Sequence, residues 1–276
     1  MDIFSAIALG ILQGITEFLP VSSSGHLVIG QHLLGWREPN VFFDVCLHVG
    51  TLIAVALVFH QDIAMLVRGG LNWLRHPLSD HRDERQEARR IFVLVLWGTI
   101  PTVIIGFACK DLFERLFASV TAVGLSFLVT GTLLWLTHRR TFFWGMGPFD
   151  MRFRHAVLVG LVQGLAITPG ISRSGTTIAV GLLLGFQREW AGRYSFLLFV
   201  PAILGAVTLG SLHLKAIPNP VHPVLWGTVA AALTGYLALR FLLALVRRGR
   251  VHLFAPYCWT LGLVCLGLKL LERGNP

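Results

Sequence analysis

The chain has 276 residues, of which 54% are hydrophobic and only 13% are charged. A soluble domain carries roughly 25% charged residues, so the composition excludes an ordinary soluble protein and predicts a membrane protein. The net charge of +9 does not indicate a nucleic-acid partner, because the basic residues stand in short stretches between apolar segments, as the positive-inside rule expects.

The first apolar region, residues 3–35, is too long and too interrupted to be one membrane span. Proline, serine and glycine break it at residues 19–25, and each half is shorter than the ~20 residues that a spanning helix needs. Non-helical backbone at membrane depth is tolerated where it is buried in protein or lines a polar cavity. We therefore expect a re-entrant hairpin of two half-helices.

The rest of the chain repeats this plan. A second broken region covers residues 156–186, with its break at 169–175. Six other stretches have the length of a transmembrane helix, or nearly so, and three of them follow each hairpin: 41–59, 91–108, 119–137, 192–213, 223–245 and 252–271. The expected fold class is an all-α polytopic membrane protein.

The two hairpins also resemble each other in sequence. At an offset of 150 residues, Gln13 aligns with Gln163, and residues 21–25 align with 171–175. We expect one integral membrane domain over 1–276, with a first repeat at 1–137 and a second at 155–276. Because each half has three spans, an odd number, the second repeat must be inverted, and sites in such folds lie near the midplane where broken helices meet.

The distribution of basic residues predicts the orientation. The expected loops 60–90, 138–155, 187–193 and 246–251 together hold fifteen lysines and arginines, and the opposite face holds six. The first face is therefore expected to be cytoplasmic. The first hairpin then enters from outside, so that the site opens toward the outer face of the membrane.

The first hairpin carries polar residues suited to phosphate chemistry. Gln13 and Glu17 are four residues apart and share one face of the entering half-helix. At the break, hydroxyl groups precede a returning half-helix whose free N–H groups favour an anion. The residues of this break that we expect at the site are Ser22, Ser23, Ser24, Gly25 and His26.

The second hairpin adds a permanent positive charge. Arg173 is its one ionisable residue, and a guanidinium offers a planar pair of donors that matches phosphate oxygens. Its neighbours at the break are again small or hydroxylated: Ser172, Ser174, Gly175 and Thr177. A single break of this kind can serve only close helix packing, but two matching copies that contain Glu, His and Arg indicate a site. Asp44 and His48 could rim it.

These motifs resemble a known family. Residues 13–26 and 169–177 are similar to the two signature motifs of the bacterial undecaprenyl-diphosphate phosphatases, the bacitracin-resistance protein family, and the likeness covers essentially the whole chain. It implies hydrolysis of a prenyl diphosphate lipid, undecaprenyl diphosphate, to the monophosphate carrier lipid and inorganic phosphate, for peptidoglycan synthesis in the bacterial plasma membrane. It also implies a divalent cation, Mg²⁺ or Ca²⁺.

The resemblance also assigns roles. Glu17, Ser23, His26 and Arg173 would be catalytic, and Glu17 would anchor the metal. Substrate binding would fall to Gln13, Ser22, Ser24, Gly25, Ser172, Ser174, Gly175 and Thr177. Gln13 departs from the Glu of many relatives, which weakens its part in metal binding.

Several alternatives stay open. Ser23 is our expected nucleophile, with His26 as base or acid, but a His26 phosphoenzyme or direct attack by water would also fit. A polyprenyl-phosphate transporter or flippase is a rival function, since inverted repeats with broken helices are a transporter plan. An acid-phosphatase-type lipid phosphatase is rejected, because residues 174–186 lack its second His and its Asp. Association into a homo-oligomer is left open.

Overall fold

The computed structural model describes residues 2–34, 41–75, 84–117, 119–139, 145–212 and 221–274. Within these ranges the chain is helical, as expected. The helices are α1 Ile3–Phe18, α2 Ser23–Leu33, α3 Val41–Val58, α4 His60–Arg75, α5 Glu84–Ala108, α6 Lys110–Phe117, α7 Val120–Leu136, η1 Thr137–Arg139, α8 Phe153–Leu165, α9 Arg173–Leu183, α10 Arg188–Leu212, α11 His222–Arg247, η2 Val251–Phe254 and α12 Ala255–Gly274.

Each of the six expected spans coincides mainly with one helix, α3, α5, α7, α10, α11 or α12, and the last also includes most of η2. In the described part of the chain, four helices are long and apolar enough to cross a membrane alone, and six spans result if each of two bent pairs counts as one. The bent pairs are α3 with α4, at 87°, and α6 with α7, at 100°. The chain is thus a multi-pass membrane protein.

Both broken regions form two short helices around a non-helical break. The first consists of α1 and α2, and the second of α8 and α9. Ser172 caps the N-terminus of α9, because its Oγ accepts the Gly175 N–H at 3.2 Å. Such a cap satisfies a backbone donor that the helix itself leaves free. The sequence prediction of two helix–break–helix segments is confirmed.

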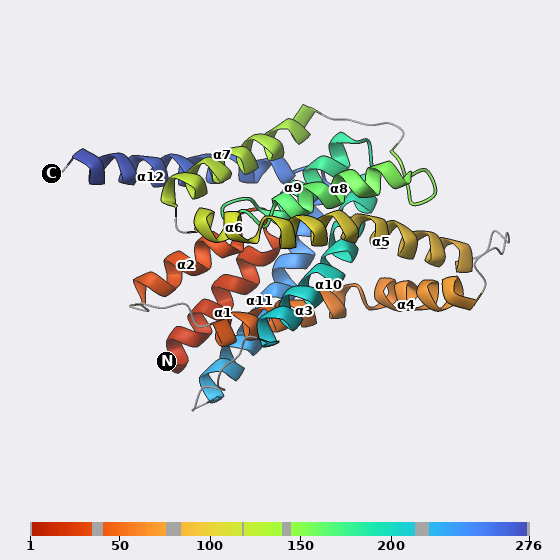
Figure 1. Cartoon of the computed structure of the whole chain (residues 1–276), viewed down its shortest axis with the longest axis horizontal. Helices are drawn as coiled ribbons and strands as arrows, with labels where there is room; N and C mark the ends of the chain where they lie inside the picture. Colours follow the sequence, from red (N-terminus) through yellow and green to blue (C-terminus); the bar gives the residue numbers. More distant parts are fainter. Residues whose placement is uncertain are drawn as a thin grey trace.

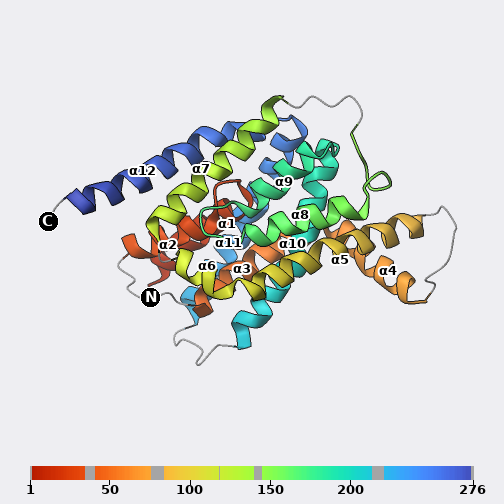
Figure 2. The same cartoon turned by 45° about the horizontal axis from the view of Figure 1, so that its top comes forward.

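The segment 60–90 differs from its prediction as a loop. Residues 60–75 form α4, and α5 begins at Glu84 rather than near residue 91. The charged residues of α4 alternate with apolar ones at helical spacing, so charge alone was the wrong criterion for a loop. Figures 1 and 2 show α4 and α5 side by side, projecting from one end of the molecule, with the C-terminus at the other end.

Close backbone contact fixes the entering helix of the first hairpin. α1 packs along α11 in the centre of the bundle (Figure 1). A Cβ on Gly10 would lie 2.2 Å from the Gly227 carbonyl oxygen, and one on Gly14 would lie 2.6 Å from that of Ala231. Small residues allow membrane helices to approach this closely. The C-terminal end of α1, which carries Glu17, is held in place by this contact.

Candidate functional site

The entering helix of the first hairpin ends in a buried carboxylate. Glu17 lies in the last turn of α1 and is 9% exposed. Gln13, one turn earlier and fully buried, donates from Nε2 to Glu17 Oε2 at 3.0 Å. This contact confirms that the two side chains share one face of the helix, and it fixes one carboxylate oxygen beside the break.

Both hairpins meet at this carboxylate. Ser23 Oγ donates to Glu17 Oε2 at 2.6 Å, and Arg173 Nη2 donates to Oε1 at 2.8 Å. Ser23 and Arg173 are the first residues of α2 and α9, and the N-terminus of a helix favours an anion through its free N–H groups. His48 of α3 adds an imidazole whose Nε2 lies 3.9 Å from Oε2. Side chains from four helices therefore converge on Glu17.

Polar and steric contacts join the two breaks. Ser22 has a φ of +64°, a left-handed conformation that raises the energy of a non-glycine residue by roughly 1–2 kcal/mol. Its Oγ accepts the N–H of Gly170 at 3.2 Å. A Cβ on Gly175 would lie 2.7 Å from the Cβ of Pro20, so the crossing of the breaks requires glycine there. Strain of this kind is typical of functional sites.

A pocket of about 150 Å³ lies at the point where the breaks meet. Six of the predicted site residues line it: Glu17, Ser22, Ser23, Ser24, Ser172 and Arg173. The remaining wall is formed by Thr16, His48, Phe117, Ala166, Ile167 and Ile171. A lining that combines hydroxyls, a carboxylate and a guanidinium with the apolar side chains Phe117, Ala166, Ile167 and Ile171 suits the phosphorylated head of an apolar molecule.

Arg173 has a free donor beside this pocket. Its guanidinium lies over the Phe199 ring, 3.5 Å from the centroid, and Nη2 is bound to Glu17. Nη1 is buried and has no hydrogen-bond partner among the described residues. A buried donor without an acceptor is costly, and a phosphate oxygen entering the pocket would satisfy it. The aromatic stack fixes the plane in which the donors point.

His26 does not line the pocket in this structure. Its Nδ1 lies 2.8 Å from the Ser22 carbonyl oxygen, and Nε2 lies 2.7 Å from the Tyr257 hydroxyl of α12. A carbonyl can only accept, so in the neutral ring Nδ1 carries the proton and Nε2 accepts from tyrosine. The catalytic role of His26 stays a prediction.

The other predicted residues position the breaks rather than face the pocket. Ser174 Oγ donates to the Phe18 carbonyl at 2.8 Å and so joins α9 to the end of α1. Thr177 Oγ1 lies 2.6 Å from Ser195 Oγ on α10 and donates to the Arg173 carbonyl at 2.8 Å. Gly25 packs at the Phe127 ring.

Four contributors come from outside the motifs: Thr130, Phe199, Tyr257 and His48. Thr130 of α7 accepts the Ser172 N–H and donates to the Gly170 carbonyl, both at 3.1 Å. Phe199 supports Arg173, and Tyr257 binds His26. Nothing in the sequence distinguishes these residues from the many others in their spans. His48 could be found, because it stands four residues from Asp44 near the end of a span.

The donor set is compatible with a hard divalent cation. No group of three or more His, Cys, Asp or Glu side chains that could hold a metal occurs in the described ranges. However, Gln13 Oε1 is buried without a hydrogen-bond partner, next to Glu17. Mg²⁺ is commonly bound by one or two carboxylates together with substrate phosphates rather than by a complete protein cage. A carboxylate in the pocket and an amide oxygen without a hydrogen-bond partner next to it are oxygen donors of the type such an ion takes.

The known proteins to which the chain is similar share one family and one name. A family model described as bacitracin resistance protein BacA matches residues 6–264. A protein of Desulfosudis oleivorans named undecaprenyl-diphosphatase is 46% identical over 274 residues, which cover 98% of this chain and 100% of the relative. Proteins with the same name from Desulforapulum autotrophicum and Halothermothrix orenii are 45% and 43% identical, each covering 96% of this chain and 98% of the relative.

Proposed function

The chain belongs to the bacitracin resistance protein BacA family, and we propose that it hydrolyses undecaprenyl diphosphate to undecaprenyl phosphate and inorganic phosphate. Its relatives carry the name undecaprenyl-diphosphatase over their whole length. The reaction returns the carrier lipid of cell-wall synthesis to the monophosphate form. A lipid substrate agrees with a pocket that lies in a helical membrane protein and has apolar as well as polar lining residues.

One observation supports this function most directly. Ser23 Oγ and Arg173 Nη2 bind the two oxygens of one carboxylate at the pocket, and Arg173 keeps a buried Nη1 with no hydrogen-bond partner among the described residues. An arginine donor and two helix N-termini are suited to hold the diphosphate, while Ser23 has the contact that an activated nucleophile needs. Phosphoryl transfer depends mainly on such positioning and on stabilisation of charge.

The mechanism assigns one task to each side chain. Arg173 and the hydroxyls of Ser22 and Ser24 hold the terminal phosphate. Ser23 Oγ attacks its phosphorus and releases undecaprenyl phosphate, while the serine proton passes to Glu17, which accepts its hydrogen bond at 2.6 Å. A water molecule then hydrolyses the phosphoserine and frees inorganic phosphate. His26 acts on this second step as base or acid once it leaves Tyr257.

A divalent cation, Mg²⁺ or Ca²⁺, would be held by Glu17 and the Gln13 Oε1 atom. When bound, it neutralises charge on the phosphate oxygens. Gln13 would be a neutral ligand, whereas a glutamate at this position would add a negative charge to the metal site.

The same proposal includes an arrangement in the membrane. The two halves, 1–137 and 155–276, form an inverted repeat within one domain, and the site opens toward the outer face. The matching breaks at an offset of 150 residues and the excess of basic residues on one face support this arrangement. A homo-oligomer is compatible with it.

A phosphate-release assay tests the function. Purified protein in detergent is given prenyl diphosphates of different lengths, with and without a chelator. We expect release of inorganic phosphate from undecaprenyl diphosphate, its loss with chelator and its recovery on addition of Mg²⁺ or Ca²⁺. Absence of phosphate release under all conditions would contradict the proposal and favour the transporter alternative.

A further inference from the structure

The pocket between the two breaks reaches the surface of the molecule at two apolar side chains. Phe117 and Ile167 are 44% and 36% exposed, and they are the most exposed of the twelve residues that line this pocket. Every polar lining residue is less exposed, and Glu17 and Ser172 are buried. We call Phe117 and Ile167 the rim of the pocket. Polar groups therefore lie behind an apolar rim.

The pocket is too small to enclose a lipid tail. Its volume is about 150 Å³, whereas sites that enclose a drug-sized ligand measure roughly 300–1,000 Å³. A diphosphate head held by the polar lining residues would therefore leave its prenyl tail outside the pocket. The exposed rim is the part of the lining past which the tail can leave.

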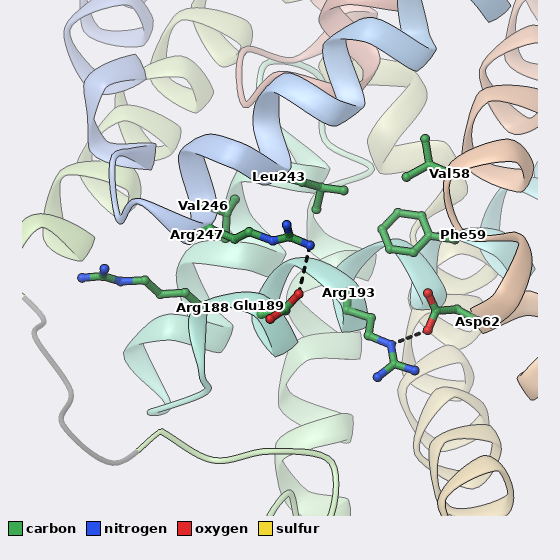
Figure 3. Close-up of a pocket in the computed structure, with 9 residues that line it drawn as sticks. All are labelled: Val58, Phe59, Asp62, Arg188, Glu189, Arg193, Leu243, Val246 and Arg247. Carbon is green, nitrogen blue, oxygen red and sulfur yellow. Dashed lines mark hydrogen bonds and ion pairs between the residues drawn. The ribbon is translucent and has the colours of Figure 1, made fainter. Parts of the chain in front are cut away.

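A second pocket, lined by α10, α11 and the corner between α3 and α4, has a rim of the opposite kind (Figure 3). The exposed residues of its lining are Arg188, Glu189 and Arg247, all of them charged, and Arg247 Nη2 lies 2.9 Å from Glu189 Oε1. Charged side chains are costly in hydrocarbon, so this rim is suited to water or lipid headgroups. The pocket with the apolar rim is the one suited to an apolar chain.

Ile167 connects the rim to an apolar face of α5. A Cβ on Gly106 of α5 would lie 3.3 Å from Ile167 Cδ1, so the two residues are neighbours. An exposed apolar stripe runs beside Gly106 at helical spacing, formed by Ile100, Val103 and Phe107 at 49%, 46% and 64% exposure. The helix is long and apolar enough to cross a membrane. A chain that leaves the pocket past Ile167 would therefore meet a surface suited to lipid.

Phe117 is the last residue of an amphipathic helix, α6. Phe113, one turn earlier, is 6% exposed and packs into the protein, whereas Lys110 and Glu114 form an exposed ion pair. Helices with one apolar and one charged side are typical of the boundary between headgroups and hydrocarbon. A lipid bound with its head in the pocket changes from head to tail at this boundary, where the ring of Phe117 is exposed.

We propose that Phe117 and Ile167 bind the first isoprene units of the substrate and direct its tail between them toward the stripe on α5. These two side chains then give the site its preference for a prenyl diphosphate over a diphosphate without a tail. The inference rests on the proposed function, which places a diphosphate head in the pocket. It assigns the two residues to substrate specificity and gives them no part in the chemical step.

Separate measurements on head and tail test this role. Purified protein in detergent is given farnesyl diphosphate, and kcat/KM for phosphate release is compared between the wild type, Phe117→Ala and Ile167→Ala. Each substitution removes apolar contact with the tail, so we expect kcat/KM to fall by about tenfold. Inorganic diphosphate, a head without a tail, serves as a competitive inhibitor, and its Ki should stay within about twofold of the wild-type value.

Matched variants and the inhibitor make the outcome decisive. Phe153→Ala and Leu204→Ala shorten side chains that are 54% and 48% exposed and do not line the pocket; neither should change kcat/KM. An unchanged kcat/KM in both rim variants would overturn the proposal. An equal rise in the Ki of inorganic diphosphate would also overturn it, because the rim would then shape the pocket rather than bind the tail.

Photo-cross-linking separates this proposal from the proposed function, since it needs no hydrolysis. The probe is a geranyl diphosphate analogue in which a benzophenone group replaces the second isoprene unit, and its adducts are mapped by mass spectrometry. We expect adducts on α6, on residues 166–171 or on the C-terminal part of α5, suppressed by inorganic diphosphate. Such adducts without phosphate release from any substrate would support the tail site and contradict the hydrolysis. Adducts confined to other helices would overturn the tail site even if hydrolysis occurs.

Discussion

The two hairpins have matching sequences but give the site different functional groups. At the offset of 150 residues, Ser23 corresponds to Arg173, and both begin a returning helix and bind Glu17, one to each carboxylate oxygen. The residue that corresponds to Glu17 is Ile167, which lines the same pocket with an apolar side chain. A repeated backbone thus supplies two helix N-termini, while single substitutions give one hairpin the nucleophile and acid and the other the cation.

The breaks also differ in where they store strain. The first has its left-handed residue at Ser22, a position whose side chain lines the pocket, and the second has it at Gly170, outside the pocket. Glycine adopts this conformation without a steric penalty, but serine does not. The first break therefore keeps a strained hydroxyl at the pocket, whereas in the second the left-handed residue is a glycine outside the pocket and the lining residues Ser172 and Arg173 follow it.

The largest expected effect is at the nucleophile of the first hairpin. Ser23→Ala should lower kcat by at least about a thousandfold, roughly 4 kcal/mol in barrier, since it removes the attacking atom. Ser24→Ala, which removes the next hydroxyl along the chain, should lose less than about tenfold. Phosphate release at saturating substrate measures both. If Ser23→Ala retains more than about a tenth of the wild-type kcat, attack by His26 or water replaces the serine mechanism.

A smaller loss of kcat is expected at Gln13, and almost none at Gln163, the glutamine that aligns with it. Gln13 Nε2 binds Glu17, whereas Gln163 Nε2 lies 3.2 Å from Thr102 Oγ1 and 3.4 Å from the Leu198 carbonyl. Gln13→Ala should lower kcat by about tenfold, because it frees the carboxylate. Gln163→Ala should leave kcat nearly unchanged and lower the free energy of unfolding by about 1 kcal/mol. Equal kinetic losses would show that the halves contribute alike.

The orientation of the hairpins in the membrane can be tested by cysteine labelling, and the substitutions used are expected to leave kcat unchanged. In a variant whose native cysteines are replaced by alanine, one cysteine is introduced within residues 79–90 and, separately, one at position 274. An impermeant thiol reagent should label the second in intact cells and leave the first unlabelled, because the basic loops are expected in the cytoplasm. The reverse pattern would place the opening of the first hairpin on the cytoplasmic face.

Local patterns predicted the spans and the breaks. The length of an apolar run predicts a membrane span, and Pro, Gly and Ser inside such a run predict a break in the helix. Basic residues such as Arg68 and Arg75 predict a loop where the structure has α4, although the helical spacing of its apolar residues is present in the sequence.

The site was only partly predictable, for a physical reason. The repeat indicated that residues 150 positions apart would meet, and Ser23 and Arg173 do so at Glu17. The direction of a side chain inside the bundle depends on distant partners. His26 is bound by Tyr257, 231 residues away, and Thr177 by Ser195. No local pattern reports such contacts.

The central claim is that Arg173 binds substrate phosphate and does not serve merely as the structural partner of Glu17. An ion pair can be maintained by lysine, but two parallel donors on a planar group cannot. The most direct measurement is kcat/KM of Arg173→Lys, alongside the amount of protein in the membrane. We predict normal accumulation and a loss of at least about a hundredfold in kcat/KM, roughly 2.7 kcal/mol of transition-state stabilisation. Near-normal kcat/KM in Arg173→Lys, together with failure of Arg173→Ala to accumulate, would contradict this claim.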